Sequence, residues 1–189
     1  MGAALQLVPK PLTAEILYGL RDLLCARRAL IKDRTAAKAR NATVTHALLK
    51  GQLAKRLRHI ECDIAKIDTA MLALANQDRQ MRERLDILSS IPSIGVTTAL
   101  MILVDMPEIG GLDGKQVASL AGLAPMSQSS GKWQGKARIQ GGRPNLRHAI
   151  FMPALVAIRH NADMKAKYNQ LIAVGKEKKV AITTVMRKL

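Results

Sequence analysis

The sequence predicts a mainly α-helical fold, in which long antiparallel or coiled-coil helices precede a compact helical domain. That domain is expected to contain a helix-hairpin-helix-like turn and a small Gly-rich loop or β-hairpin. Strong helix formers (Ala, Leu, Met, Lys, Arg and Gln) dominate the 189 residues. Aromatic residues make up only 2% of the chain, which argues against a β-sandwich. A heptad repeat over residues 53–88 predicts the coiled-coil part of this fold.

The N-terminal part of the chain is predicted to be a lead-in followed by a basic helix. Residues 1–13 form the lead-in, and Thr13 can cap a helix over 14–39 that has Glu15 in its first turn. Apolar and basic residues recur along this helix with helical spacing. A break is expected within residues 41–45.

The clearest periodicity is a seam of apolar residues that recur in alternating steps of four and three. It predicts a coiled-coil helix about 54 Å long, at roughly 1.5 Å per residue. Two interpretations are open and can coexist. The seam packs against helix 14–39 in an intramolecular hairpin, or it joins copies of the chain in a homo-oligomer, with Asp78 setting the register. The seam positions are Leu53, Leu57, Ile60, Ile64, Ile67, Met71, Leu74, Asp78, Met81, Leu85 and Leu88.

The pattern changes after residue 90, where Gly and Pro become frequent, and residues 91–189 are predicted to form the compact domain. Residues 14–90 are the expected dimerisation segment. The polar, Gly-rich segment 124–143 is expected to be a loop or a β-hairpin. The expected helices of the second domain cover about 96–106, 114–121, 144–160, 163–174 and 176–189.

The chain is strongly basic, with a formal net charge of +16 from 30 Lys and Arg against 14 Asp and Glu. A charge of this size favours a polyanionic partner, with nucleic acid as the first candidate and an anionic membrane as the second. No apolar run approaches the roughly 18 residues that a membrane span needs, so no membrane partner is expected. Cys25 and Cys62 lack CxxC spacing, which predicts small, reduced core residues in a cytoplasmic protein.

Residues 91–99 resemble the hairpin of a helix-hairpin-helix module. In that motif a tight turn presents backbone N–H groups at a helix N-terminus, where they bind a DNA phosphate. The candidate phosphate contacts are Ser93, Gly95 and Thr97, with Ser93 at the position of the usual first glycine. The alternative is a simple linker between the two predicted parts of the chain.

A second candidate site lies between Ala121 and Arg147, where three serines and five cationic side chains are close in sequence. A serine hydroxyl is a poor nucleophile unless a base takes its proton and cations stabilise the charge on the attacked phosphate. No Asp or Glu lies between Gly114 and Asn161, so the segment offers no carboxylate base or metal ligand. Taken alone, these residues favour a phosphate-binding loop over a catalytic one. They are Ser127, Ser129, Ser130, Lys132, Lys136, Arg138, Arg143 and Arg147.

Several motifs in order resemble the C-terminal transposase domain of the IS-one-ten family of insertion-sequence transposases. They are the AGLAP turn, the run SSGKWQGKARIQGGRPNLRHAIFMPALVAIRHN, and the terminal GKEKKVAITTVMRKL. The upstream run LRDLLCARRALIKDRTAAKARN resembles the basic helix that precedes the coiled coil of the family. The resemblance spans nearly all of residues 14–189, and its multi-part spacing makes it specific.

The resemblance implies DNA transposition or site-specific recombination, in which a serine nucleophile attacks a DNA phosphodiester. Matching the Ser-Gly pair of the family places that nucleophile on Ser130, with Ser129 as the alternative. The order Arg143-Pro144-Asn145 departs slightly from the glycine-asparagine order of the family. The residues expected to bind nucleic acid here are Lys132, Lys136, Arg138, Arg143, Asn145, Arg147 and His148.

Family members also carry an N-terminal RuvC-like domain whose acidic residues bind Mg²⁺, and some are guided by a structured RNA. The sequence shows no counterpart of that acidic domain, so we expect no metal or cofactor in this chain and Mg²⁺ only in the full-length family enzyme. We therefore expect this chain alone to bind DNA without recombining it, with a guide RNA as a further candidate partner. The alternatives are a non-catalytic, dimeric architectural DNA-binding protein and a helical partner protein whose charge serves RNA.

Overall fold

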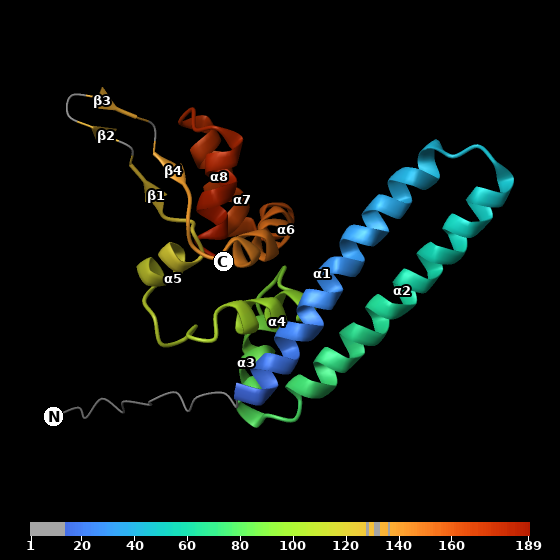
Figure 1. Cartoon of the computed structure of the whole chain (residues 1–189). Coiled ribbons are helices and arrows are strands. Elements are labelled where there is room, and N and C mark those ends of the chain that lie inside the picture. The colour runs from blue at the N-terminus through green and yellow to red at the C-terminus, as the bar shows by residue number, and fades with distance from the viewer. Residues whose placement is uncertain (1–13, 128, 131–132, 136) are drawn as a thin grey trace. The chain divides into compact units, whose positions relative to one another are not determined.

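The computed structural model describes residues 14–127, 129–130, 133–135 and 137–189. The chain divides into two compact units between Glu83 and Arg84, and each unit is described by itself. Figure 1 shows the long helices of the first unit and the short helices and β-strands of the second. The predicted mainly helical fold is confirmed.

The first unit is an antiparallel helical hairpin. Helices α1 (Ala14–Thr43) and α2 (Ala47–Ala75) are joined by the short turn at 44–46 (Figure 1). His46 caps α2, because its Nδ1 accepts a hydrogen bond from the Leu48 backbone N–H at 3.3 Å. The turn overlaps the break that the sequence predicts at 41–45.

The predicted seam packs against α1 of the same chain. Seam residues from Leu53 to Leu74 are buried or half-buried, and Leu20 and Leu24 of α1 are buried. Gly19 permits a close approach of the helices, because a Cβ there would lie only 2.9 Å from the Leu74 Cδ2. This packing agrees with the intramolecular hairpin interpretation, and the homo-oligomer stays a prediction.

An ion pair links the two long helices. The Arg27 Nε lies 2.6 Å from the Asp68 Oδ1, and a second guanidinium nitrogen lies 3.3 Å from the Asp68 Oδ2. The two side chains are 16% and 32% exposed, so the pair is partly shielded from water. Two parallel hydrogen bonds restrict the geometry more than a single contact does, so they favour the observed register of α1 against α2.

A short turn at 76–78 interrupts the seam, so the predicted continuous helix over 53–88 is wrong. Helix α2 ends at Ala75, and α3 (Arg79–Ser89) begins after Asp78. The Asp78 Oδ1 accepts a hydrogen bond from the Met81 backbone N–H at 2.9 Å, as the side chain of a helix N-cap does. The polar residue within the seam therefore starts a new helix.

The two cysteines are free and exposed, so the prediction that they are core residues is wrong. Cys25 follows the buried Leu24 by one position, which is about 100° around the helix. Cys62 is two positions, or about 200°, from the buried Ile60 and from the buried Ile64. Both thiols therefore lie away from the apolar faces of their helices.

The second unit contains five helices after α3. They surround a core to which the strongly apolar helix α4 contributes five buried residues. Helix α4 packs on α6, and α6, α7 and α8 pack on one another. The predicted helices are confirmed, with ends that differ by at most three residues. They are α4 (Val96–Asp105), α5 (Gly114–Leu120), α6 (Pro144–His160), α7 (Ala162–Ala173) and α8 (Lys178–Met186).

The segment between α5 and α6 is a β-hairpin, one of the two forms predicted for it. Strand β1 (Pro125–Met126) pairs with β4 (Arg138–Ile139) in antiparallel register, with Pro125 opposite Ile139. Farther along the hairpin, β2 (Ser129–Ser130) pairs with β3 (Trp133–Gln134). The hairpin therefore carries the serine pair away from the helical core, whereas Arg138 lies on the pair of strands nearer its base (Figure 1).

Candidate nucleic-acid interface

Two glycine turns meet closely at the base of the β-hairpin. Gly122 (φ 67°) follows α5, and Gly142 (φ 61°) precedes α6. A Cβ at Gly142 would lie 2.6 Å from both the Gly122 Cα and the Leu120 carbonyl oxygen, which are backbone atoms. A Cβ at Gly122 would meet the Gly141 carbonyl oxygen. The contact therefore requires glycine on both sides, and it fixes where the hairpin leaves the core.

Arg147, predicted to contact phosphate, binds both glycine turns. Its Nη1 donates hydrogen bonds to the Gly141 carbonyl oxygen at 3.0 Å and to the Gly122 carbonyl oxygen at 3.3 Å. These two carbonyl groups come from the two ends of the hairpin. The observed role of Arg147 is thus to position the hairpin, and its phosphate contact stays a prediction.

Arg143 holds the other side of the hairpin base. Its guanidinium forms a bidentate ion pair with Glu108, at 2.7 and 2.8 Å, and also donates to the Asp105 carbonyl oxygen at 2.8 Å. The hydrogen bonds that Arg143 donates to Glu108 raise the pKa of Arg143 above its usual value. Arg143 therefore also has a positioning role, and its contact with phosphate stays a prediction.

A third arginine, which sequence reasoning missed, supports the loop that carries Glu108. Arg84 donates hydrogen bonds to the Pro107 and Ile109 carbonyl oxygens at 2.7 and 2.6 Å. Burial lowers the pKa of Arg84, because it disfavours the charged form. The partners of Arg84 and Arg143 lie more than 20 residues away in sequence, so no local motif could have revealed them.

The serine pair occupies strand β2. In the backbone register Ser129 lies opposite Gln134, and Ser130 lies opposite Trp133. The side chains of both serines lie outside the described part of the structure, as do Lys132 and Lys136. The hairpin therefore brings the predicted nucleophile and its alternative to adjacent positions of one strand.

The remaining predicted contacts lie near the hairpin and are open to solvent. Arg138 on β4 is exposed, as are Asn145 and His148 in the first two turns of α6. In the described part of the chain, Arg138 forms no ion pair. These side chains are free to meet a polyanion. Arg143 and Arg147 instead use part of their hydrogen-bonding capacity within the chain.

The predicted helix-hairpin-helix-like turn precedes α4. Gly95 is the N-cap of α4 and supplies no side-chain hydrogen bond to the first turn, where Thr97 lies. Ser93 has a φ of 85°, the left-handed conformation for which such turns usually have glycine. Its Oγ is buried and has no hydrogen-bond partner among the described residues. The helix-hairpin-helix-like turn and its phosphate contacts stay a prediction, and the serine side chain is poorly accommodated at this position.

This misfit predicts that replacing Ser93 by Gly stabilises the protein. Glycine removes the left-handed strain, about 1–2 kcal/mol for an L-residue, and the unpaired hydroxyl. The added freedom of glycine in the unfolded chain offsets part of the gain, so we expect a net increase of about 1 kcal/mol in the free energy of unfolding. Urea denaturation measures it. Ser93→Ala, which keeps the strain, serves as the control, and equal stability of the two variants would contradict the explanation.

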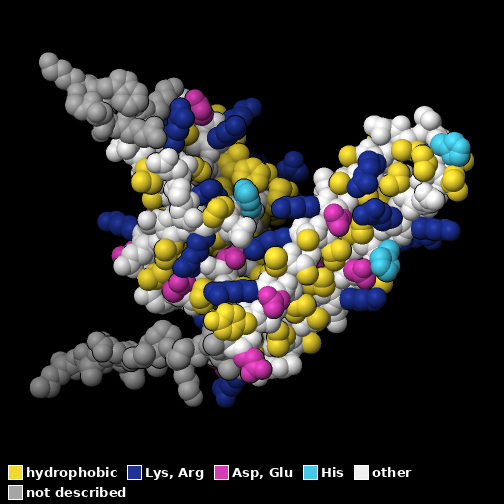
Figure 2. Space-filling view, in the orientation of Figure 1, with side chains coloured by type: hydrophobic (Ala, Val, Ile, Leu, Met, Phe, Trp, Pro, Cys, Tyr) yellow, Lys and Arg dark blue, Asp and Glu magenta, His cyan; other side chains and the backbone are white. Residues whose placement is uncertain are grey.

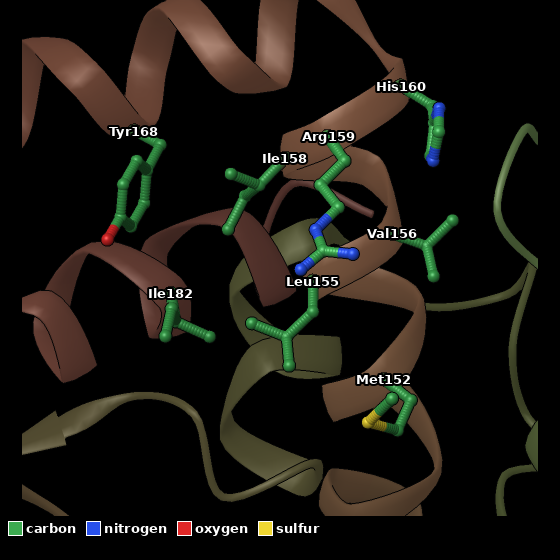
Figure 3. Close-up of a pocket in the computed structure, with 8 residues that line it drawn as sticks. All are labelled: Met152, Leu155, Val156, Ile158, Arg159, His160, Tyr168 and Ile182. Atoms are coloured by element: carbon green, nitrogen blue, oxygen red, sulfur yellow. The ribbon is translucent and has the colours of Figure 1, made fainter.

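A separate pocket of about 320 Å³ lies between α6, α7 and α8. Figure 3 shows its lining: aliphatic side chains and Met152 along one side of α6, with Tyr168 and Ile182 across from them. Arg159 and His160 supply the only charged or titratable groups besides Tyr168 among the eight lining residues. A lining of this kind suits an apolar contact better than a phosphate group.

Basic side chains are spread over both units. In Figure 2 the visible face shows more Lys and Arg side chains than Asp and Glu side chains. Within the described residues, no group of three or more His, Cys, Asp or Glu is placed to hold a metal ion. None of the helices described has an apolar stretch long enough to cross a bilayer.

These observations define a basic, mainly helical protein with a serine-bearing β-hairpin fixed to a helical core. Residues 85–169 match the family model described as "Transposase IS116/IS110/IS902 family". Residues 85–169 therefore carry a domain of this family of transposases, the family that the motifs of the chain resemble.

Similar proteins extend the match into the first unit. The chain is 32% identical over 167 residues to the "Pilin gene-inverting protein" of Moraxella bovis, covering 86% of this chain and 50% of that protein. It is 29% identical over 182 residues to the "Insertion element IS900 uncharacterized 42 kDa protein" of Mycobacterium paratuberculosis, covering 86% of this chain and 42% of that protein. The chain spans about half the length of the curated relatives it matches.

Proposed function

We propose that this chain takes part in DNA transposition or site-specific recombination, by binding DNA and supplying Ser130 as the nucleophile, with Ser129 as the alternative. The observation that carries the proposal is the serine pair on a β-hairpin within a transposase-family domain. The name of the Moraxella bovis relative describes the inversion of a gene, which is a recombination reaction. The net charge of +16 supports DNA as the partner.

The proposed step is a transesterification. The Ser130 Oγ attacks the phosphorus of a DNA phosphodiester, an O–P bond forms, and the P–O bond to the leaving strand breaks. The serine proton passes to a base, and the leaving oxygen takes up a proton. Attack by the hydroxyl group of another strand reverses the chemistry and releases the serine, so the exchange needs no oxidant, reductant or nucleotide. The cations near β2 would stabilise the negative charge that develops on the phosphate.

The described residues around the serine pair include no carboxylate base, and the described residues form no Mg²⁺ site. The segment between Gly114 and Asn161 contains no carboxylate, and the described residues hold no cluster of metal ligands. Mg²⁺ in the full-length enzyme therefore stays a family expectation, and no part of the step above is assigned to it. Replacing Ser130 by Ala in the full-length protein should abolish strand cleavage and leave DNA affinity unchanged, which tests the proposal.

DNA binding by phosphate contacts predicts a strong dependence on salt. Each phosphate that a Lys or Arg neutralises on duplex DNA contributes about 0.9 to the slope of log affinity against log salt. For 6–10 contacts, affinity should fall by roughly 10³–10⁵ between about 50 and 200 mM salt. Fluorescence anisotropy with labelled DNA measures the slope for the 189-residue chain. An affinity that does not change with salt would contradict phosphate binding, and a preference for structured RNA would identify an RNA as the main partner.

A second candidate function is a non-catalytic, dimeric architectural DNA-binding protein. It is favoured by the intramolecular partners of Arg143 and Arg147, because both arginines hold the base of the β-hairpin in place. The long α1–α2 hairpin would then supply a homo-oligomer interface in addition to its internal packing. The two candidates differ in chemistry, because only the recombinase forms a covalent bond with DNA.

A further inference from the structure

A second basic surface lies in a groove between the base of the β-hairpin and α8. The groove has a volume of about 750 Å³. Strand β4 contributes one wall with Arg138 and Ile139, and residues 175–187 contribute the other. Figure 1 shows α8 alongside this end of the hairpin. Apart from Arg138, its cationic residues lie in the terminal run GKEKKVAITTVMRKL, and none of them was among the residues expected to bind nucleic acid.

One face of α8 lines the groove. Val180, Thr183, Thr184 and Arg187 line it, and these positions are spaced by three and four residues, as on one side of a helix. The opposite side of α8 carries the buried Ala181 and Val185, which pack in the core. The helix is therefore held firmly by its apolar side and presents a fixed surface to the groove.

The groove is positively charged. Four cationic side chains line it against the single carboxylate of Glu177, a formal net charge of +3. All four are exposed, and in the described residues none of them forms an ion pair. The threonine hydroxyls donate to helix carbonyl groups, Thr183 to Lys179 at 2.9 Å and Thr184 to Val180 at 3.0 Å. Binding of an anion would therefore depend on the cations, Arg138, Lys176, Lys179 and Arg187.

The groove also has exposed aliphatic side chains. Val180 is 48% exposed and Ile139 is 38% exposed, on facing walls. A DNA duplex stacks its bases inside and presents phosphates outward, so it offers little apolar surface to these side chains. A single strand presents both its phosphates and the faces of its sugars and bases. A charged groove with apolar surface therefore suits a single strand better than a duplex.

We propose that this groove binds single-stranded DNA. The inference rests on the proposed function and extends it. It assigns the groove to the DNA strand that continues toward the serines of the β-hairpin. Met126 pairs with Arg138 in the groove wall, and Ser130 is four positions after Met126. Four residues of chain reach at most about 14 Å. A strand held in the groove thus lies close enough for one of its neighbouring phosphates to approach β2.

The test compares the DNA affinity of a variant that lacks two groove cations with that of a variant that lacks two cations elsewhere. The groove variant is Lys179→Gln with Arg187→Gln, and the matched control is Lys115→Gln with Lys165→Gln, which are exposed residues of the same unit outside the groove. The probe is a labelled oligothymidylate of about 20 nucleotides, longer than the roughly 4–16 nucleotides of typical single-strand sites. We expect about tenfold weaker binding by the groove variant and about twofold by the control. The salt slope should fall by about 1.4 for two lost contacts at about 0.7 each.

Equal weakening by both pairs would mean that only total charge matters and would overturn the proposal, as would unchanged binding by the groove variant. Val180→Thr, which keeps the shape of the side chain, separates single strand from duplex. We expect about threefold weaker binding of oligothymidylate by this variant and unchanged binding of duplex DNA. Equal loss for both probes would contradict a single-stranded occupant, and wild-type binding of oligouridylate more than about tenfold tighter than oligothymidylate would identify RNA instead.

The binding assay uses the 189-residue chain, so its outcome is independent of strand cleavage. Normal oligothymidylate binding by the groove variant, together with a Ser130-dependent cleavage reaction, would reject the groove and leave the proposed function intact. Weak binding by the groove variant, together with no cleavage by the full-length protein, would support the groove and reject the proposed function. Equal melting temperatures of the variants exclude unfolding as the cause of any loss.

Discussion

Replacing Gly142 by Ala is expected to destabilise the second unit by about 3 kcal/mol and to separate the β-hairpin from the helical core. A Cβ at this position would lie 2.6 Å from the Gly122 Cα and from the Leu120 carbonyl oxygen. Both are backbone atoms, so no side-chain rotation relieves the contact. The left-handed φ of 61° adds about 1–2 kcal/mol for a residue with a Cβ, and the forced backbone shift adds about 1–3 kcal/mol.

Gly141→Ala is the matched control for this substitution. Gly141 belongs to the same turn and has a similar φ of 69°, but a Cβ there meets no atom within 4 Å. We therefore expect it to cost only the conformational strain, about 1–2 kcal/mol. Urea denaturation compares the two variants, and fluorescence of Trp133, the single Trp of the chain, reports on the hairpin. Equal destabilisation by the two substitutions would contradict the close contact at the hairpin base.

Replacing Ser130 by Ala in the full-length protein is expected to lower the rate of DNA cleavage by about 10³-fold or more. The substitution removes the oxygen that forms the bond to phosphorus, and residual rates of enzymes without their nucleophile come from binding and charge stabilisation alone. DNA affinity should change little, because the hydroxyl group carries no charge. Cleavage of labelled DNA and anisotropy measure the two quantities on the same preparation.

Ser129→Ala is the control for the nucleophile, since it makes the same chemical change one residue earlier in β2. We expect this variant to cleave DNA at close to the wild-type rate. The reverse pattern, with cleavage lost only in Ser129→Ala, would assign the nucleophile to Ser129. Full activity of both variants would remove the catalytic role from the hairpin and favour the architectural protein.

The long helices could be predicted from the sequence, because a seam over many turns is a strong signal. The interruption at Asp78 could not be, since an Asp at a seam position is compatible with a buried polar residue and with an N-cap. Only the hydrogen bond from the Met81 N–H to the Asp78 carboxylate decides between them. The prediction that Cys25 and Cys62 are core residues was wrong for a related reason. Residue type does not define which face of a helix a side chain occupies.

The candidate site could be predicted only as a segment. Its Gly and Ser content indicated a loop or hairpin, but not the contact between Gly122, just before that segment, and Gly142, near its end. The role of Arg143 depends on Glu108, 35 residues earlier in the chain. The groove depends on α8 and its C-cap, where Lys179 and Arg187 follow Arg138 by 41 and 49 residues. Contacts over such separations follow from packing, so the local pattern identified the cationic residues and not their partners.

Mapping the covalent bond between protein and DNA tests most directly whether a serine of the β-hairpin becomes joined to DNA. The full-length protein is incubated with DNA, denatured and digested, and the peptides are analysed by mass spectrometry. We expect a nucleotide attached to the peptide that contains Ser129 and Ser130, with fragmentation placing it on Ser130. DNA attached to a residue outside this hairpin, or DNA that is cleaved with no covalent attachment to the protein, would contradict it.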